Sequence, residues 1–84
     1  MKETLILNFQ NRTTGENFDI EVPMNITANE LIVSLNEGLN LDMNLKDATK
    51  CFLRTENPIS LLKGDVLLEE YGLHEGSIVW YEQQ

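Results

Sequence analysis

The sequence predicts an α+β fold, with a mixed sheet of four to five strands and one main helix packed on one face. Several short segments alternate apolar and polar residues, as half-buried strands do, and one stretch after Thr27 spaces its apolar residues as an amphipathic helix does. With 84 residues, 42% hydrophobic and 24% charged, the composition is that of a globular protein. We therefore expect residues 1–84 to form a single domain.

The first two alternating segments predict an antiparallel hairpin. Residues 4–9 (TLILNF) and residues 18–22 (FDIEV) each alternate, and the cluster QNRTTGE between them contains Gly15, a typical turn residue. Thr4, Ile6 and Asn8 then lie on the outer face. The residues expected to face the core are Leu5, Leu7, Phe9, Phe18, Ile20 and Val22.

The helix follows Pro23, which ends the second strand. Thr27 and Glu30 have the spacing of a capping box, in which each side chain accepts a hydrogen bond from the other residue's backbone N–H. Gly38 is the expected C-cap. The apolar stripe that should face the sheet consists of Ala28, Leu31, Ile32, Leu35 and Leu39.

The second half of the chain predicts three more strands. A crossover loop, NLDMNLKDAT, is expected to be anchored by Leu41 and Leu45, and the strand KCFLRT follows it. A short strand (ISLL), a compact turn or single helical turn (DVLLEEYGL) and a closing strand at residues 77–81 complete the chain. The right-handed solution for this order places the first and last strands side by side, which is a β-grasp.

Composition excludes several classes of function. Fourteen acidic residues against six Lys and Arg give a net charge of −8, which disfavours nucleic acids and anionic membrane surfaces as partners. Cys51 is the only cysteine, which fits a reducing compartment. The apolar run near the N-terminus is too short for a signal peptide or a spanning helix. We therefore expect a cytoplasmic protein without direct membrane insertion.

The second half resembles a ubiquitin-like domain in the passage LLKGDVLLEEYGLHEGSIVWY, where Leu68, Tyr71, Leu73 and Gly76 fall at matching places. Within that group the chain resembles the YukD/EsaB family, through its length, FDIEVP, the NPISLL-KGD passage and the YGLHEG hinge. These small proteins accompany the type VII (WXG100, ESX-like) secretion machinery of Gram-positive bacteria. The resemblance implies a cytoplasmic accessory or regulatory protein that docks onto a component of that machinery.

The C-terminal residues bear on conjugation. Ubiquitin and related sulfur carriers end in a flexible Gly-Gly tail that can thread a narrow enzyme channel. This sequence ends in Glu82-Gln83-Gln84. We therefore expect neither conjugation nor sulfur transfer.

Catalytic, metal and cofactor chemistry find little support in the sequence. A thiol enzyme would need Cys51 polarised by His74, yet Cys51 falls in the apolar phase of a strand, where cysteines are usually inert. Asp42, Asn44 and Asp47 resemble part of a calcium loop but lack its glycine and final glutamate. An iron–sulfur cluster needs four cysteines. We expect no enzyme activity, no metal and no cofactor.

Strand phase instead predicts a binding surface on the uncovered face of the sheet. The phase of the last strand is ambiguous, but the resemblance to ubiquitin-like domains and the position of Glu82 favour Val79 and Tyr81 as core residues. The alternate residues of this strand then face outward with those of the first and third strands. Exposed aromatic residues often mark protein-binding sites. The candidate surface consists of Ile6, Phe52, Ile78 and Trp80, ringed by Lys50 and Arg54. The alternatives are that Trp80 lies inward and fills the core, or that a loop covers Phe52.

Three functions therefore follow, in decreasing order of support. The first is a non-catalytic docking protein of type VII secretion, whose partner is a secretion component. The second is a generic ubiquitin-like adaptor unrelated to secretion, and the third is a small thiol enzyme that uses Cys51. The same surface could also meet a second copy of the chain across a two-fold axis, giving a homodimer.

Overall fold

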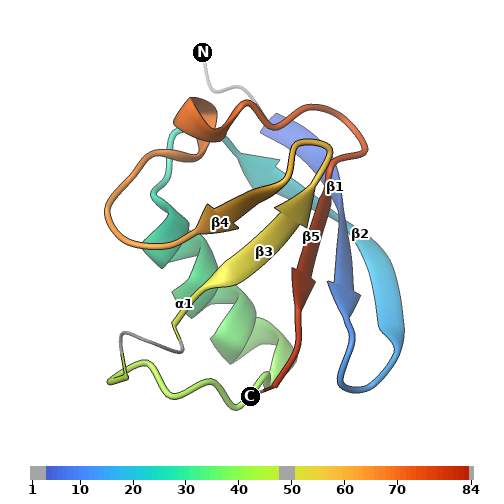
Figure 1. Cartoon of the computed structure of the whole chain (residues 1–84), viewed down its shortest axis with the longest axis vertical. Coiled ribbons are helices and arrows are strands. Elements are labelled where there is room, and N and C mark those ends of the chain that lie inside the picture. The colour runs from blue at the N-terminus through green and yellow to red at the C-terminus, as the bar shows by residue number, and fades with distance from the viewer. Residues whose placement is uncertain (1–3, 48–50, 84) are drawn as a thin grey trace.

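The computed structural model describes residues 4–47 and 51–83, and it has the predicted α+β architecture (Figure 1). One α-helix and five strands are present in these residues. In chain order the elements are β1 (Thr4–Asn11), β2 (Glu16–Pro23), α1 (Ala28–Leu39), β3 (Leu53–Glu56), β4 (Ser60–Leu62), the 3₁₀ turn η1 (Leu68–Tyr71) and β5 (Ile78–Tyr81).

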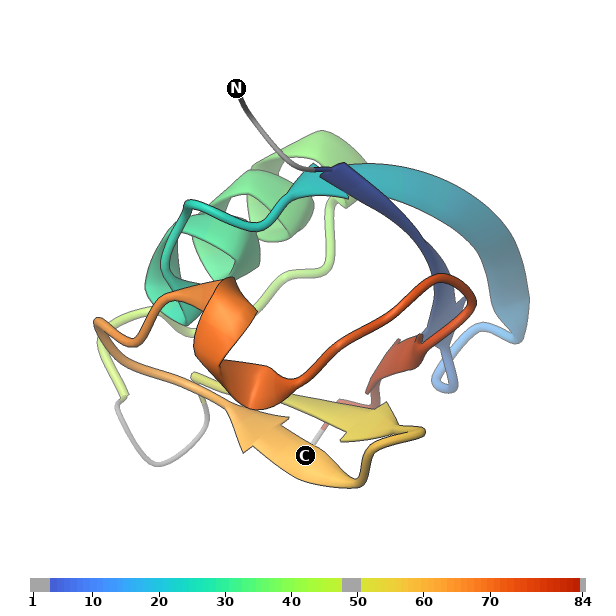
Figure 2. The same ribbon diagram turned by 90° about the horizontal axis from the view of Figure 1, so that it is seen from above.

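The five strands form one mixed sheet in the order β2-β1-β5-β3-β4. The first and last strands are parallel neighbours, as predicted, and the other three pairings are antiparallel. The helix α1 packs across one face of this sheet, and the other face is left open (Figures 1 and 2). This arrangement confirms the predicted β-grasp.

The β1–β2 hairpin is longer than the alternation predicted. Pairing runs without interruption from Thr4 opposite Pro23 to Asn11 opposite Glu16, so part of the expected turn cluster belongs to the strands. The Asn11 side chain makes this possible, because its Oδ1 accepts hydrogen bonds from the N–H groups of Thr13 and Thr14.

The helix begins as predicted and ends later than predicted. The Glu30 N–H donates to Thr27 Oγ1 at 3.1 Å and the Thr27 N–H donates to Glu30 Oε1 at 3.3 Å, which confirms the capping box. The prediction of Gly38 as C-cap is wrong, because the left-handed position falls on Asn40, with φ 53°. Asparagine tolerates this conformation better than most residues, so the helix continues to Leu39.

The hydrophobic core lies between α1 and the covered face of the sheet. Alternate residues of the strands are buried there, and Val79 and Tyr81 are among them, as predicted. Phe9 packs against the half-buried Phe18, with ring centroids 5.7 Å apart. The other buried apolar side chains are Leu7, Val22, Met24, Ala28, Leu31, Ile32, Leu35, Leu41, Met43, Leu53, Leu62 and Leu68.

The crossover after α1 differs from the prediction at one of its two anchors. Leu41 is buried as expected, but Leu45 is 39% exposed, and Met43 takes the anchoring role instead. The Met43 N–H donates to the Asn36 side chain at 2.8 Å, which ties this part of the loop to the last turn of the helix.

The third strand begins later than predicted. Lys50 lies outside the described residues, and Cys51 and Phe52 precede β3 instead of forming part of it. The reason is the length of β4, which ends at Leu62 opposite Leu53 and offers no partner beyond that point. Cys51 is half-buried and packs against the core.

A candidate protein-interaction surface on the open sheet face

Strand register brings the outward residues of four strands into one row. Gln10 lies opposite Trp80, Trp80 lies opposite Arg54, and Arg54 lies opposite Leu61. Trp80 is therefore at the centre of the open face. The alternative that it fills the core beneath α1 is wrong, because Val79 and Tyr81 occupy that side.

Two arginine side chains cover the indole of Trp80. The Arg12 guanidinium carbon lies 3.9 Å from the ring centroid, and that of Arg54 lies 5.6 Å from it. Arg54 also lies 5.2 Å from the ring of Phe52. Each distance is within the range of a cation–π interaction, so the aromatic rings and the guanidinium groups form one cluster. We call Arg12, Phe52, Arg54 and Trp80 the aromatic–arginine cluster.

Arg12 is the member of this cluster that the sequence did not reveal. It follows β1 in the turn, where side-chain direction cannot be derived from alternation. The pairing of β1 with β5 places it, because the Arg12 N–H donates to the Tyr81 carbonyl at 2.8 Å. Its guanidinium then reaches back over Trp80 and forms an ion pair with Glu56 at 3.5 Å. Only a known register between the first and last strands could have indicated this contact.

The two aliphatic residues of the predicted surface extend the cluster along the central strands. Ile78 is half-buried and lies between Asn8 and Glu56. Ile6 is 41% exposed and lies two positions before Asn8 on β1. Because outward residues recur every second position, Ile6 lies diagonally next to Ile78. The outward apolar residues therefore run in a stripe from Ile6 to the aromatic–arginine cluster.

Two further apolar residues extend this surface toward the β4 edge. Leu61 lies opposite Arg54 and is 36% exposed, and Ile59, at the tip of the β3–β4 hairpin, is 89% exposed. The sequence carried a signal for Leu61, because it alternates with the buried Leu62. Ile59 has the same phase as Leu61 in the predicted strand ISLL, but it lies in the turn just before β4.

The part of the open face formed by β2 and by Thr4 and Asn8 of β1 is polar. Asp19 accepts a hydrogen bond from the Asn8 amide, and Glu21 accepts one from the Thr4 hydroxyl at 3.0 Å. Asn17 accepts a second bond from the Asn8 amide. The open face is thus divided into an acidic and amide-rich half and a half that is apolar and cationic.

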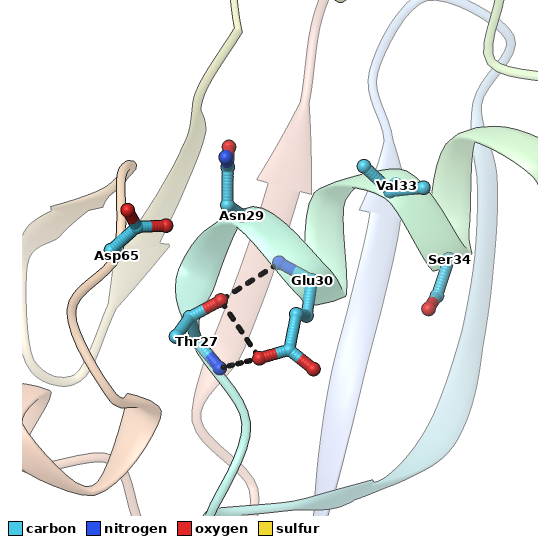
Figure 3. A pocket seen from close by; sticks show the side chains of 6 residues that line it. All are labelled: Thr27, Asn29, Glu30, Val33, Ser34 and Asp65. Atoms are coloured by element: carbon cyan, nitrogen blue, oxygen red, sulfur yellow. Dashed lines mark hydrogen bonds between the residues drawn. The ribbon is translucent and has the colours of Figure 1, made fainter.

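A groove of about 410 Å³ lies at the N-terminal end of α1 (Figure 3). Its lining includes Glu30 and Asp65, and the Glu30 carboxylate is already engaged in the capping box. Two carboxylates oppose the anions that a helix N-terminus attracts. We assign no binding role to this groove, which is lined by Thr27, Asn29, Glu30, Val33, Ser34 and Asp65.

The structure separates the residues that a thiol enzyme would need. Cys51 precedes β3, and His74 lies in the loop before β5. Because β3 and β5 are antiparallel, with Arg54 opposite Trp80, these two residues fall toward opposite ends of the strand pair. No Cys51–His74 dyad is formed.

The acidic side chains after the helix do not gather into a site either. Asn44 Oδ1 accepts a hydrogen bond from the Lys46 N–H at 3.1 Å and is directed into its own loop. Across residues 4–47 and 51–83, no three His, Cys, Asp or Glu side chains are grouped so that they could hold a metal ion. In the same residues, no helix has the length and apolarity needed to cross a membrane.

Solved structures with the same architecture were found, although no family model and no curated protein matches the sequence. The C-terminal ubiquitin-like domain of mouse tubulin-specific chaperone e superposes with a TM-score of 0.74 and 14% identity, over 99% of this chain and 89% of that one. The UBL domain of Plasmodium falciparum Dsk2 gives 0.69 and 20% identity, over 98% and 100% of the two chains. The fold is ubiquitin-like.

A third similar structure is the UBL domain of yeast Ddi1, with a TM-score of 0.66 and 22% identity over 92% of this chain and 85% of that one. At these identities the likeness concerns the fold and not the function.

Proposed function

We propose that this ubiquitin-like chain is a non-catalytic docking module that binds a protein partner through the apolar half of its open sheet face. The observation that carries the proposal is the position of Trp80 and Phe52. Both aromatic residues lie on the face that α1 does not cover, and the groups that shield their rings are two arginine side chains.

This surface has the composition of a protein-binding hot spot. Tryptophan and arginine are enriched among the residues that contribute most to binding, and a partner that displaces water from a large ring gains more than one that contacts a polar surface. Stacking on the rings also orders the guanidinium groups before binding, which lowers the entropy cost of association. The surface consists of Ile6, Arg12, Phe52, Arg54, Ile78 and Trp80, with Ile59 and Leu61 at its margin. Lys50, which the sequence also assigned to it, lies outside the described residues.

The proposed partner is a component of a type VII secretion system, and the chain is a cytoplasmic accessory protein of that system. The support is the resemblance of FDIEVP, NPISLL-KGD and YGLHEG to the YukD/EsaB family. The ubiquitin-like fold is compatible with it. A ubiquitin-like adaptor with no part in secretion is the second candidate, because the fold alone serves it equally well.

Binding by purified components tests the docking surface. We expect Trp80→Ala and Phe52→Ala each to weaken binding to the cytosolic domains of the secretion machinery about tenfold or more, measured by calorimetry. Val33→Ala is the control, because Val33 is an exposed apolar residue on α1, which packs on the other face of the sheet. Both open-face variants should keep the far-ultraviolet spectrum of the folded protein. Equal binding by all three variants would refute the assignment of this face.

A genetic experiment separates secretion from the generic adaptor. We expect deletion of the gene in its source organism to change the amount of WXG100 protein secreted, with restoration by the wild-type gene and not by the Trp80→Ala gene. Unchanged secretion in the deletion strain would exclude the secretion role and favour the adaptor.

A further inference from the structure

The two edges of the sheet are built differently, and only one of them offers a long template for another strand. The edge strand β4 spans three residues, which is one of the ways proteins avoid pairing at an edge. The other edge strand, β2, spans eight residues and pairs with β1 in one continuous register without a bulge. Among the described residues, no strand pairs with the outer side of β2.

The hydrogen bonds between β1 and the segment before β5 fix which backbone groups of β2 face outward. The Ile6 carbonyl accepts from the Gly76 N–H at 2.9 Å, and the Asn8 N–H donates to the Ser77 carbonyl at 2.9 Å, so the backbone groups of Ile6 and Asn8 point toward the β5 side. In an antiparallel pair, the residues opposite them then direct their N–H and C=O groups away from β1. Those residues are Glu21 and Asp19, and Asn17 follows in the same phase.

The side chains of β2 determine which residue types an added strand needs on each of its two faces. Asn17, Asp19 and Glu21 lie on the open face, whereas Phe18 and Ile20 point to the core side and remain half-buried. Figure 2 shows the reason, because β2 sweeps away from α1 toward the β1–β2 turn. A strand added here would cover Phe18 and Ile20 with every second residue, and would place the alternate residues beside Asp19 and Glu21.

Charge decides between the possible occupants. A second copy paired through the same edge would bring its own Asp19 and Glu21 against these acids, and like charges on neighbouring strands are destabilising. A strand with basic residues would gain from the two local acids and from the net charge of −8, which attracts cationic segments at long range.

We propose that the β2 edge is a second binding site, which takes an extended protein segment that alternates basic and apolar residues. The segment adds a sixth strand beside β2, with its basic side chains on the open face and its apolar side chains over Phe18 and Ile20. This site is separate from Trp80 at the centre of the aromatic–arginine cluster, because β1 lies between β2 and β5.

A synthetic peptide that alternates lysine with valine, blocked at both ends, tests the site on the full chain. We expect hydrogen exchange of the Asn17, Asp19 and Glu21 amides to slow on peptide addition, while the amides of Phe18 and Ile20, which face β1, change little. This alternation distinguishes strand addition from loose electrostatic attachment, which would not select every second amide. A peptide of the same composition with its lysines in one block should not produce the pattern.

Two variants and a matched control complete the test. Asp19→Asn combined with Glu21→Gln should weaken binding of the alternating peptide about fivefold, whereas Glu69→Gln combined with Glu70→Gln, with the same net charge, should weaken it less than twofold. Trp80→Ala should leave peptide binding unchanged. The β2-edge proposal can therefore be refuted without refuting the proposed role of the open face. Uniform or absent protection along β2, equal effects of the two double variants, or pairing of two copies through β2 would each overturn the proposal.

Discussion

Val79 and Trp80 are neighbours on β5, yet they are shielded from water in two different ways. Val79 points toward α1 and is 0% exposed, because the helix and the covered face of the sheet enclose it. Trp80 points the other way and is only half-buried, with two arginine side chains over its ring. The first kind of burial is made by the fold, and the second is made by side chains that can move without changing the fold.

This difference separates stability from recognition within one strand. Apolar groups between helix and sheet lose their contacts only when the protein unfolds, so their substitution changes the free energy of unfolding. An arginine over an exposed ring contributes little to that free energy, and a partner can replace it or bind beside it. The following four predictions test this contrast, beginning with the largest expected effect.

The largest effect is expected in the core, at Phe9. Phe9→Ala removes a ring that is completely buried and that packs against Phe18, so we expect a loss of about 3–5 kcal/mol in the free energy of unfolding. Ile6→Ala is the control on the other face of the same strand, where we expect a loss below about 1 kcal/mol. Urea denaturation measures both. Similar losses would show that the open face is as tightly packed as the core.

The next effect concerns the helix that makes the covered face. Thr27→Ala removes the acceptor for the Glu30 N–H and breaks the capping box, which should cost about 1 kcal/mol. Ser34→Ala, at an exposed position within α1, should change the free energy of unfolding by less than about 0.5 kcal/mol. The measurement is again urea denaturation, and equal effects would mean that the cap does not stabilise the helix.

A smaller effect is expected on the open face, where Arg12 covers the only tryptophan. Arg12→Gln should destabilise the fold by about 0.5–1 kcal/mol and should increase quenching of Trp80 fluorescence by acrylamide, because the guanidinium no longer shields the ring. Arg54→Gln is the comparison, and it should increase quenching less because Arg54 lies farther from the centroid. Greater quenching in Arg54→Gln than in Arg12→Gln would contradict the expectation that Arg12 shields the Trp80 ring more than Arg54 does.

Residue patterns predicted the fold well because the fold depends on local periodicity. The alternation of Leu7 and Phe9 and the capping box at Thr27 each follow from neighbours in sequence, and the structure confirms both. Alternation left the phase of Val79 ambiguous, and the resemblance to ubiquitin-like domains favoured the burial that the structure shows. One error is local, because the left-handed C-cap position falls on Asn40 and not on Gly38. The other errors lie where a contact outside the element decides the outcome. The start of β3 is set by where β4 ends, and Leu45 is exposed because Met43 occupies the anchoring position.

The candidate surface was predictable only in the part that lies within strands. The outward positions of Ile6 and Ile78 follow from alternation once the buried face is chosen. The contact between Arg12 and Trp80 joins residues from a turn and from the last strand, and it depends on the parallel pairing of β1 with β5. The sequence pattern does not reveal the register between β1 and β5. The position of Arg12 over Trp80 therefore could not be predicted from the sequence.

The smallest effect is expected at Tyr81, which lies on the covered side of β5 next to Trp80. Burial raises the pKa of the Tyr81 hydroxyl above its ordinary value of 10.0, and the Asp42 carboxylate raises that pKa further. The unfolded chain therefore ionises at lower pH than the folded protein, so this contribution to stability is complete below pH 10 and is lost as the pH rises through the folded-state pKa.

Asp42→Asn removes the charge contribution and keeps the burial, so the folded-state pKa of Tyr81 should fall toward 10.0 without reaching it. Asp65→Asn, in the groove at the other end of α1, should leave this pKa unchanged. Titration of the phenolate absorbance measures the pKa in each variant. Equal pKa values in the Asp42→Asn variant and the wild type would assign the whole shift to burial, and Tyr81 would then resemble Val79 in being governed by the fold alone.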